Sequence, residues 1–191
     1  MFILCDPQET QPALCADSAQ ISESSSEGSA TSMSSVCRLD STIISLDPYL
    51  PPSTFRYDLT DQDYTLVKEG PPLSVEPTKL LFSRFVAENE VWISGEELIR
   101  RIEETLPEQG PMAGQWQEEA LLSQSDKIPI ERREGALVFL ATNWRHPHGG
   151  TCVTYLCWFA CQWEFRFDYL GAHRWGKYDR VVRLPYVPPT T

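Results

Sequence analysis

Residues 162–169 read Gln162-Trp163-Glu164-Phe165-Arg166-Phe167-Asp168-Tyr169, a regular alternation of polar and aromatic side chains. Successive side chains of a β-strand point to opposite faces of a sheet, so this stretch predicts a strand with one aromatic and one charged face. We expect the aromatic face to be buried against a helix over residues 94–106. Further strands are predicted over 136–144, 152–159 and 180–184.

The helix over 94–106 has the clearest local signal in the chain. Ser94 and Glu97 match a capping box, in which the serine is the N-cap residue and the glutamate reaches back to its amide. Ile93 and Leu98 occupy the positions of a hydrophobic staple, and Pro107 is expected to stop the helix. The buried face is predicted to consist of Leu98, Ile99, Ile102 and Leu106.

A second helix is predicted over 113–123, with Trp116, Ala120 and Leu121 facing inward, and a short turn over 129–133. Because helical patterns precede alternating ones, the fold class is α+β. We expect two or three helices on one face of a four- to five-stranded, mainly antiparallel sheet. This domain is predicted to span 79–187.

The residues before this domain have a different composition. Nine of the eighteen residues from Ser18 to Ser35 are serine, which predicts a disordered, acidic tail over 1–40. Prolines recur over 41–78, a range that we interpret as an extended linker, with a short strand over 42–46. Within this range, the aromatic side chains of Phe55, Tyr57 and Tyr64 are the ones most suited to pack on the domain.

The formal net charge of -11 is unevenly distributed. Residues 1–70 carry eleven acidic and three basic side chains, whereas 135–191 carry three acidic and six basic ones. The whole-chain charge argues against non-specific binding to nucleic acid or to an anionic membrane. No apolar run approaches the roughly 20 residues of a membrane span. We therefore expect a cytoplasmic protein with reduced cysteines and no membrane partner.

Several short runs resemble small uncharacterised bacterial proteins known mainly from environmental genomes. These runs are Ile93-Ser94-Gly95-Glu96-Glu97, Gly114-Gln115-Trp116-Gln117-Glu118-Glu119-Ala120-Leu121-Leu122, Ile128-Pro129, Leu137-Val138-Phe139-Leu140-Ala141-Thr142 and Trp158-Phe159-Ala160-Cys161-Gln162-Trp163. The resemblance covers about 90–184 and implies a fold without an assigned activity. In those proteins Gly-Gly occupies the turn where this chain has Ala160-Cys161, so the residues favoured in a type I′ turn are missing here.

Two constellations are candidates for chemistry. His146 and His148 flank a proline in a glycine-ended turn, and with Cys152 they are the candidate metal ligands, although no CxxC or HxxxH spacing is present. Cys161 is a candidate nucleophile if a histidine lies beside it. We expect neither, and predict no metal, no cofactor and no catalytic residue. The adjacent glutamates are expected on solvated helix faces; they are Glu96-Glu97, Glu103-Glu104 and Glu118-Glu119.

The basic, aromatic C-terminal part suggests a nucleic-acid contact, since bases stack on exposed rings while cations bind phosphates. The candidate residues are Arg145, Arg166, Arg174, Trp175, Lys177 and Arg180. The alternation over 162–169 instead favours rings buried in a core. The leading interpretation is a non-catalytic interaction domain with an unknown protein partner. A nucleic-acid-binding module and a small metal- or Cys/His-dependent hydrolase are the alternatives, and exposed rings or converging polar groups would distinguish them.

Overall fold

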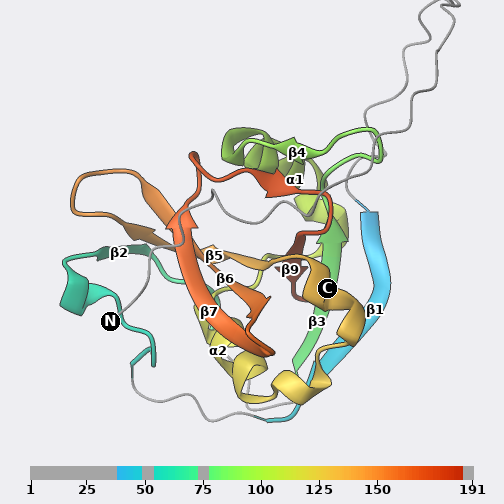
Figure 1. Cartoon of the computed structure of the whole chain (residues 1–191), viewed down its shortest axis with the longest axis horizontal. Coiled ribbons are helices and arrows are strands. Elements are labelled where there is room, and N and C mark those ends of the chain that lie inside the picture. The colour runs from blue at the N-terminus through green and yellow to red at the C-terminus, as the bar shows by residue number, and fades with distance from the viewer. Residues whose placement is uncertain (1–37, 49–53, 73–77, 187–191) are drawn as a thin grey trace, which may run out of the picture. The chain divides into compact units, whose positions relative to one another are not determined.

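The structure, a computed structural model, describes residues 38–48, 54–72 and 78–186, which belong to one compact unit (Figure 1). The elements are β1 (Arg38–Leu46), η2 (Thr60–Gln62), β2 (Thr65–Lys68), β3 (Thr78–Arg84), β4 (Trp92–Ile93), α1 (Gly95–Gln109), α2 (Gln115–Ser123), η3 (Ser125–Lys127), η4 (Ile130–Glu134), β5 (Leu137–Arg145), β6 (Thr151–Phe159), β7 (Gln162–Tyr169), β8 (Trp175–Gly176) and β9 (Arg180–Arg183). The α+β class is confirmed. The tail predicted over 1–40 lies outside the described residues except for its last three positions.

Seven strands form one mixed sheet in the order β1-β3-β9-β5-β6-β7, and β2 pairs with β5. The only parallel pair in the described sheet joins β5 to β9. A separate two-stranded ribbon consists of β4 and β8. The sheet is larger than the four to five strands predicted because β1 and β2 belong to it. Most of β1 and all of β2 come from the range 41–78 that the prolines had suggested to be a linker.

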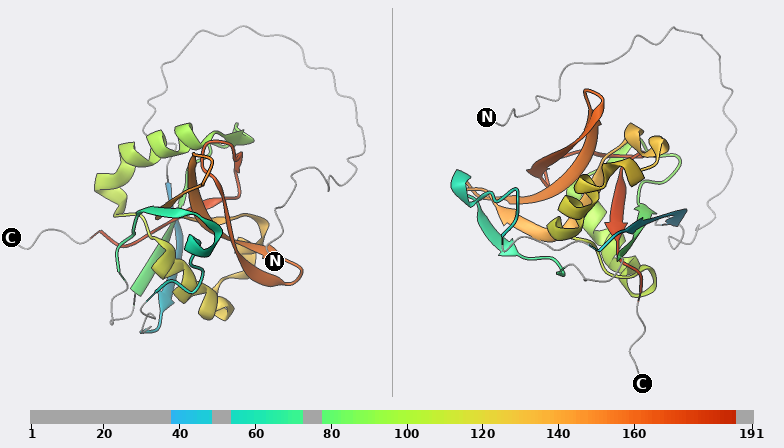
Figure 2. Two further views of the ribbon diagram at one scale, coloured as in Figure 1. Left: turned by 90° about the vertical axis from the view of Figure 1, so that its left-hand side faces the viewer. Right: turned by 90° about the horizontal axis from the view of Figure 1, so that it is seen from below.

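Strand β5 is buried along most of its length, and alternate side chains supply two separate cores. Leu137 and Phe139 join a cluster that includes Ala120 and Leu121 of α2. Val138 and Leu140 point to the other face and join the cluster around α1. The two helices therefore cover opposite faces of the sheet (Figure 2). The prediction that they share one face was wrong, since a strand buried on both faces needs cover on both.

The aromatic face of β7 is in the core, but against a different helix from the one predicted. Trp163 and Phe165 are 8% and 9% exposed and pack in the cluster that contains α2. Phe167 is half-buried at the margin of that cluster. The neighbouring ring of Tyr57 stacks on Phe165 with the ring centroids 4.4 Å apart. The residues around position 57 thus cover part of the sheet.

Strand β1 is held by charge as well as by pairing with β3. The Asp40 carboxylate lies 2.7 Å from a guanidinium nitrogen of Arg132 and 2.8 Å from Nε of Arg180. All three side chains are largely buried, with exposed fractions of 16%, 12% and 8%. Removing one member of such a group leaves uncompensated buried charge. Asp40 therefore belongs to the folded unit rather than to a tail.

The predicted turn between β6 and β7 is formed without glycine. Ala160 and Cys161 have φ values of 46° and 66°, in the left-handed region that glycine adopts most easily. The hairpin is nevertheless in register, with Phe159 opposite Gln162 and Trp158 opposite Trp163. Both residues of a type I′ turn need positive φ, so this turn has the expected geometry with unfavourable side chains.

The start of α1 follows the prediction closely. Ser94 is the N-cap, and its hydroxyl accepts a hydrogen bond of 3.3 Å from the Glu97 amide. Ile93 and Leu98 are buried in the same cluster, as expected of a staple. The helix continues past Pro107 to Gln109, so it ends three residues later than predicted.

Glu97 does not complete the capping box. Its carboxylate turns outward to the guanidinium groups of Arg100 and Arg101. The hydrogen bonds from Arg100 and Arg101 lower the pKa of Glu97 to about 2. The charged face of the helix thus has its own network, and the Ser94 hydroxyl caps the helix without a reciprocal bond.

We predict that Ser94→Ala lowers the free energy of unfolding by about 0.5–2 kcal/mol, because the first turn of α1 loses its side-chain acceptor. Urea denaturation followed by far-ultraviolet circular dichroism measures the change. Ser94→Asp is the control and should retain most of the stability, since Asp caps helices about as well. Equal stability of the alanine variant and the parent chain would contradict the assignment of Ser94 as the cap.

Candidate functional site

The histidine loop between β5 and β6 does not form a metal site in the described structure. His146 Nδ1 accepts a hydrogen bond from the amide of His148, and the two rings are 5.2 Å apart. His146 also contacts the rings of Tyr64 and Tyr169. Within residues 38–48, 54–72 and 78–186, no three His, Cys, Asp or Glu side chains are grouped as a metal site would require.

Cys152, the third candidate ligand, is 1% exposed and packs in a small aromatic cluster with Trp144. Burial, together with the charge of Asp168, raises the pKa of Cys152 to about 11. A metal ligand or a nucleophile must be the thiolate, so this cysteine is suited to packing rather than to either role.

Cys161 is exposed in the β6–β7 turn, as predicted. The histidines lie beyond the opposite end of this hairpin, at 146, 148 and 173. A strand of eight residues rises by about 25 Å, so these imidazoles are too distant to activate the thiol. The Cys161 thiol and the imidazoles therefore lie at opposite ends of the hairpin, whereas a Cys/His enzyme needs them side by side.

One acid–imidazole pair was not predicted. Asp168 Oδ2 lies 2.9 Å from Nδ1 of His173. Burial would raise the pKa of Asp168, but hydrogen bonds from His173 and from the Tyr169 amide lower it below the usual value. The imidazole packs between Tyr155 and Trp175, with centroids 5.8 and 4.3 Å away. This enclosure fixes the loop that connects β7 to β8.

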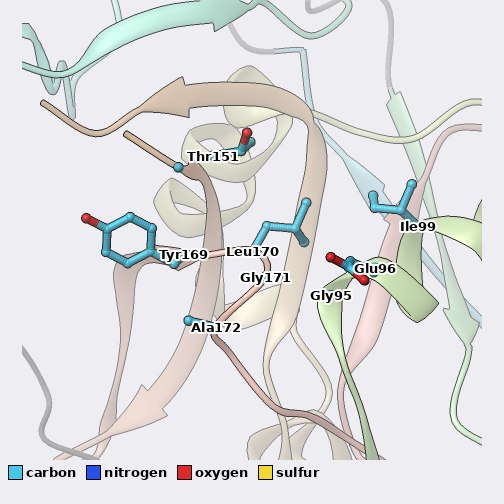
Figure 3. A pocket seen from close by; sticks show the side chains of 9 residues that line it. Gly95, Glu96, Ile99, Thr151, Tyr169, Leu170, Gly171 and Ala172 are labelled. Carbon is cyan, nitrogen blue, oxygen red and sulfur yellow. The ribbon is translucent and has the colours of Figure 1, made fainter. Parts of the chain in front are cut away.

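A pocket of about 610 Å³ lies where the first turn of α1 meets this loop (Figure 3). Its walls are mostly apolar, and Glu96 supplies the one charged side chain of the lining. A Cβ atom on Gly95 would lie 1.8 Å from the carbonyl oxygen of Leu170, so the helix can approach the loop this closely only with glycine there. The pocket has the size of a ligand site but few converging polar groups.

The most polar part of the interior is α2, whose residues from Gln115 to Leu121 are all buried. The Glu119 carboxylate accepts hydrogen bonds from the amides of Arg56 and Tyr57, at 2.9 and 3.1 Å. Gln115 donates to the Tyr57 carbonyl and accepts from the Trp144 indole, at 2.8 and 2.9 Å. The expectation that Glu118 and Glu119 lie on a solvated face was therefore wrong, because residues 54–72 cover this helix.

Glu118 differs from its neighbour because it is fully buried without such partners. Neither carboxyl oxygen has a hydrogen bond within the described residues, and the same is true of the buried Thr154 hydroxyl. Burial raises the pKa of Glu118 well above the usual value, and the charge of Glu119 adds to this shift. Thr154 offsets part of the shift but lies outside normal hydrogen-bond geometry.

A raised pKa in the folded state means that Glu118 stabilises the fold below its unfolded pKa of about 4.3, and that this contribution disappears as pH rises through the folded pKa. We predict that Glu118→Gln gains stability relative to the parent chain between pH 5 and pH 9. Thermal unfolding of both proteins across this range measures the difference.

Glu119→Gln is the matched control. Glu119 accepts three hydrogen bonds, so the amide should destabilise the fold by about 1.5–3 kcal/mol at pH 5, where Glu118→Gln should have its smallest effect. A Glu118→Gln effect that does not change with pH would show that this carboxyl titrates normally.

The candidate nucleic-acid residues do not form one surface. Trp175 is fully buried, and Arg180 is 6% exposed and bound to Asp40. Arg166 is paired with Glu164 on β7. These three side chains are therefore buried or paired with a carboxylate of the same chain.

The three remaining candidates are exposed, on two different parts of the fold. Arg145 ends β5, opposite Thr65 and Thr151. Arg174 and Lys177 flank β8 in the ribbon of β4 and β8, and their side chains are exposed.

Exposed apolar side chains belong to the same ribbon as those two cations. Val91, Trp92 and Tyr178 are 76%, 47% and 51% exposed. The Arg174 guanidinium lies 4.5 Å from the centre of the Trp92 ring, and Lys177 Nζ lies 4.9 Å from that of Tyr178. We call these five residues the ribbon patch. Trp92 was not predicted, although the inward Ile93 beside it implies by alternation that Trp92 points outward.

The ribbon holds this patch in a defined position beside α1 (Figure 1). Trp92 pairs with Gly176, and the Lys177 amide donates to the Val91 carbonyl at 3.3 Å. The Asp179 carboxylate accepts from the Gly176 amide at 2.6 Å and from the Ala136 amide, just before β5, at 2.8 Å. The exposed rings are thus attached to a fixed backbone.

The chain matches no family model, no curated protein and no solved structure. Among the helices that the structure describes, none is long and apolar enough to cross a membrane. The geometry of the chain itself is therefore the basis for a functional assignment.

Proposed function

We propose that this protein is a non-catalytic, cytoplasmic interaction domain that binds an acidic segment of another protein through the ribbon patch. The observation that carries the proposal is the exposure of Trp92, Val91 and Tyr178 beside two cations on a fixed ribbon. Tryptophan, tyrosine and arginine are the residue types that contribute most to protein interfaces.

The chemistry of the patch defines the partner. A ring that stacks with a guanidinium offers an apolar surface and keeps the cation in place for a carboxylate. Within the described residues, neither Arg174 nor Lys177 forms an ion pair with a carboxylate. A segment with acidic side chains around one apolar or aromatic anchor matches this combination of charge and surface.

Selection of peptides from a random display library on the immobilised chain tests this proposal. We predict that the selected peptides are acidic and contain an aromatic or leucine residue, and that Trp92→Ala reduces their affinity by at least about tenfold, or 1.4 kcal/mol. Fluorescence polarisation with labelled peptide measures the affinity.

Phe159→Ala is the matched control, because Phe159 is 55% exposed and lies under a guanidinium at another place on the surface. It should leave peptide binding unchanged. Peptides whose binding does not depend on Trp92 would contradict the proposal. Binding of an oligothymidine in place of acidic peptides, lost in Trp92→Ala, would establish the nucleic-acid alternative.

A further inference from the structure

Strand β7 lies at the end of the sheet order. All eight of its residues, from Gln162 to Tyr169, pair with β6, and no strand pairs with its other side among the described residues. Figures 1 and 2 show β7 along one border of the sheet. An open edge of this length is a template for pairing with another chain.

The hairpin geometry shows which backbone groups face outward. Phe159 and Gln162 close a two-residue turn, and the closing pair of such a turn is hydrogen-bonded. Even-numbered residues of β7 therefore bond to β6. The N–H and C=O groups of Trp163, Phe165 and Phe167 point to the open side.

We propose that this edge binds the same edge of a second copy of the chain, antiparallel, about a two-fold axis at Phe165. The outward groups of Phe165 in the two copies then exchange two hydrogen bonds. On one face, Trp163 lies opposite Phe167 of the second copy. On the other face, Glu164 lies opposite Arg166 of the second copy, and the reverse pair forms by symmetry.

The charges select this register. Moving one copy by two residues places Glu164 opposite Glu164, or Arg166 opposite Arg166, depending on the direction. Like charges directly opposite each other are destabilising. A shift by one residue would place the outward N–H and C=O groups of one copy opposite residues whose N–H and C=O groups already bond to β6. A register centred on Phe167 would place Arg166 opposite Asp168, but that carboxylate is bonded to His173 and the Tyr169 carbonyl accepts from the His173 amide. The register centred on Phe165 therefore combines opposite charges with backbone groups that have no such partner among the described residues.

The two charged side chains are accessible for this role. Glu164 and Arg166 are 24% and 19% exposed, and Arg166 Nε donates to the Glu164 carboxylate at 3.1 Å within one chain. In the dimer each carboxylate lies between two guanidinium groups. The contact uses the same patch in both copies, so it closes at two chains and does not continue into a fibre. It is separate from the ribbon patch and does not depend on the proposed function.

Sedimentation equilibrium of the full chain over a concentration series tests the dimer. The parent chain should be dimeric, and E164R and R166E should each weaken dimerisation by about tenfold or more, since each places like charges opposite one another. An equimolar mixture of the two variants should regain the dimer, because their charges are opposite at both positions.

The doubly exchanged variant E164R/R166E restores opposite charges and should dimerise as the parent does. Circular dichroism of each variant checks its fold, and the double variant provides the measurement if a single variant unfolds. A parent chain that is monomeric at every concentration overturns the proposal. So does a dimer that the single variants leave unchanged, since that dimer would use another surface.

Discussion

The polar side chains of α2 lie inside the protein, where each needs a hydrogen-bond partner because water cannot reach it. Most of these partners come from residues 54–72. Gln117 donates to the Pro71 carbonyl, Glu119 accepts from two backbone amides, and the Trp116 indole donates to the Glu69 carboxylate. The same segment also bonds to β5, where the Thr142 hydroxyl accepts from the Gly70 amide. The helix and this segment therefore depend on each other, since neither can satisfy its buried groups alone.

The sheet connects this polar layer to the ribbon patch. One face of β5 packs on α2, and the opposite face packs on α1 together with Ile93 and Trp175 of the ribbon. The inward side chains of the ribbon are thus fixed in the core, and its outward side chains are presented to solvent. A rigid scaffold with exposed rings loses little conformational entropy on binding, which is the property an interaction domain requires.

Local patterns in the sequence predicted the features that depend on local contacts. The cap at Ser94, the staple of Ile93 and Leu98, and the alternation of β7 each involve residues close together in the chain. The solvated glutamates of α2 were predicted wrongly because the partner of Glu119 is the amide of Arg56, far along the chain. A pair of adjacent glutamates on a short helix has the same local pattern whether it faces water or a buried backbone.

The site was less predictable than the fold for the same reason. Arg174 and Lys177 were among the predicted residues, but the ring beside Arg174 is Trp92, which reaches it through strand pairing between distant segments. Trp175, its sequence neighbour, is instead buried in the core. Composition suggested a base-stacking surface only as an alternative, because the exposure of a ring is decided by which side of a strand it occupies.

The central claim is that residues 54–72 are part of the folded core through the buried polar groups of α2. Native-state hydrogen exchange of the Arg56, Tyr57 and Gly70 amides tests this claim most directly. We predict that these amides exchange only with global unfolding, as slowly as those of Val138 and Phe139 in β5, because their acceptors are the Glu119 carboxylate and the Thr142 hydroxyl. Exchange at the rate of an unstructured peptide, while β5 remains protected, would contradict the account.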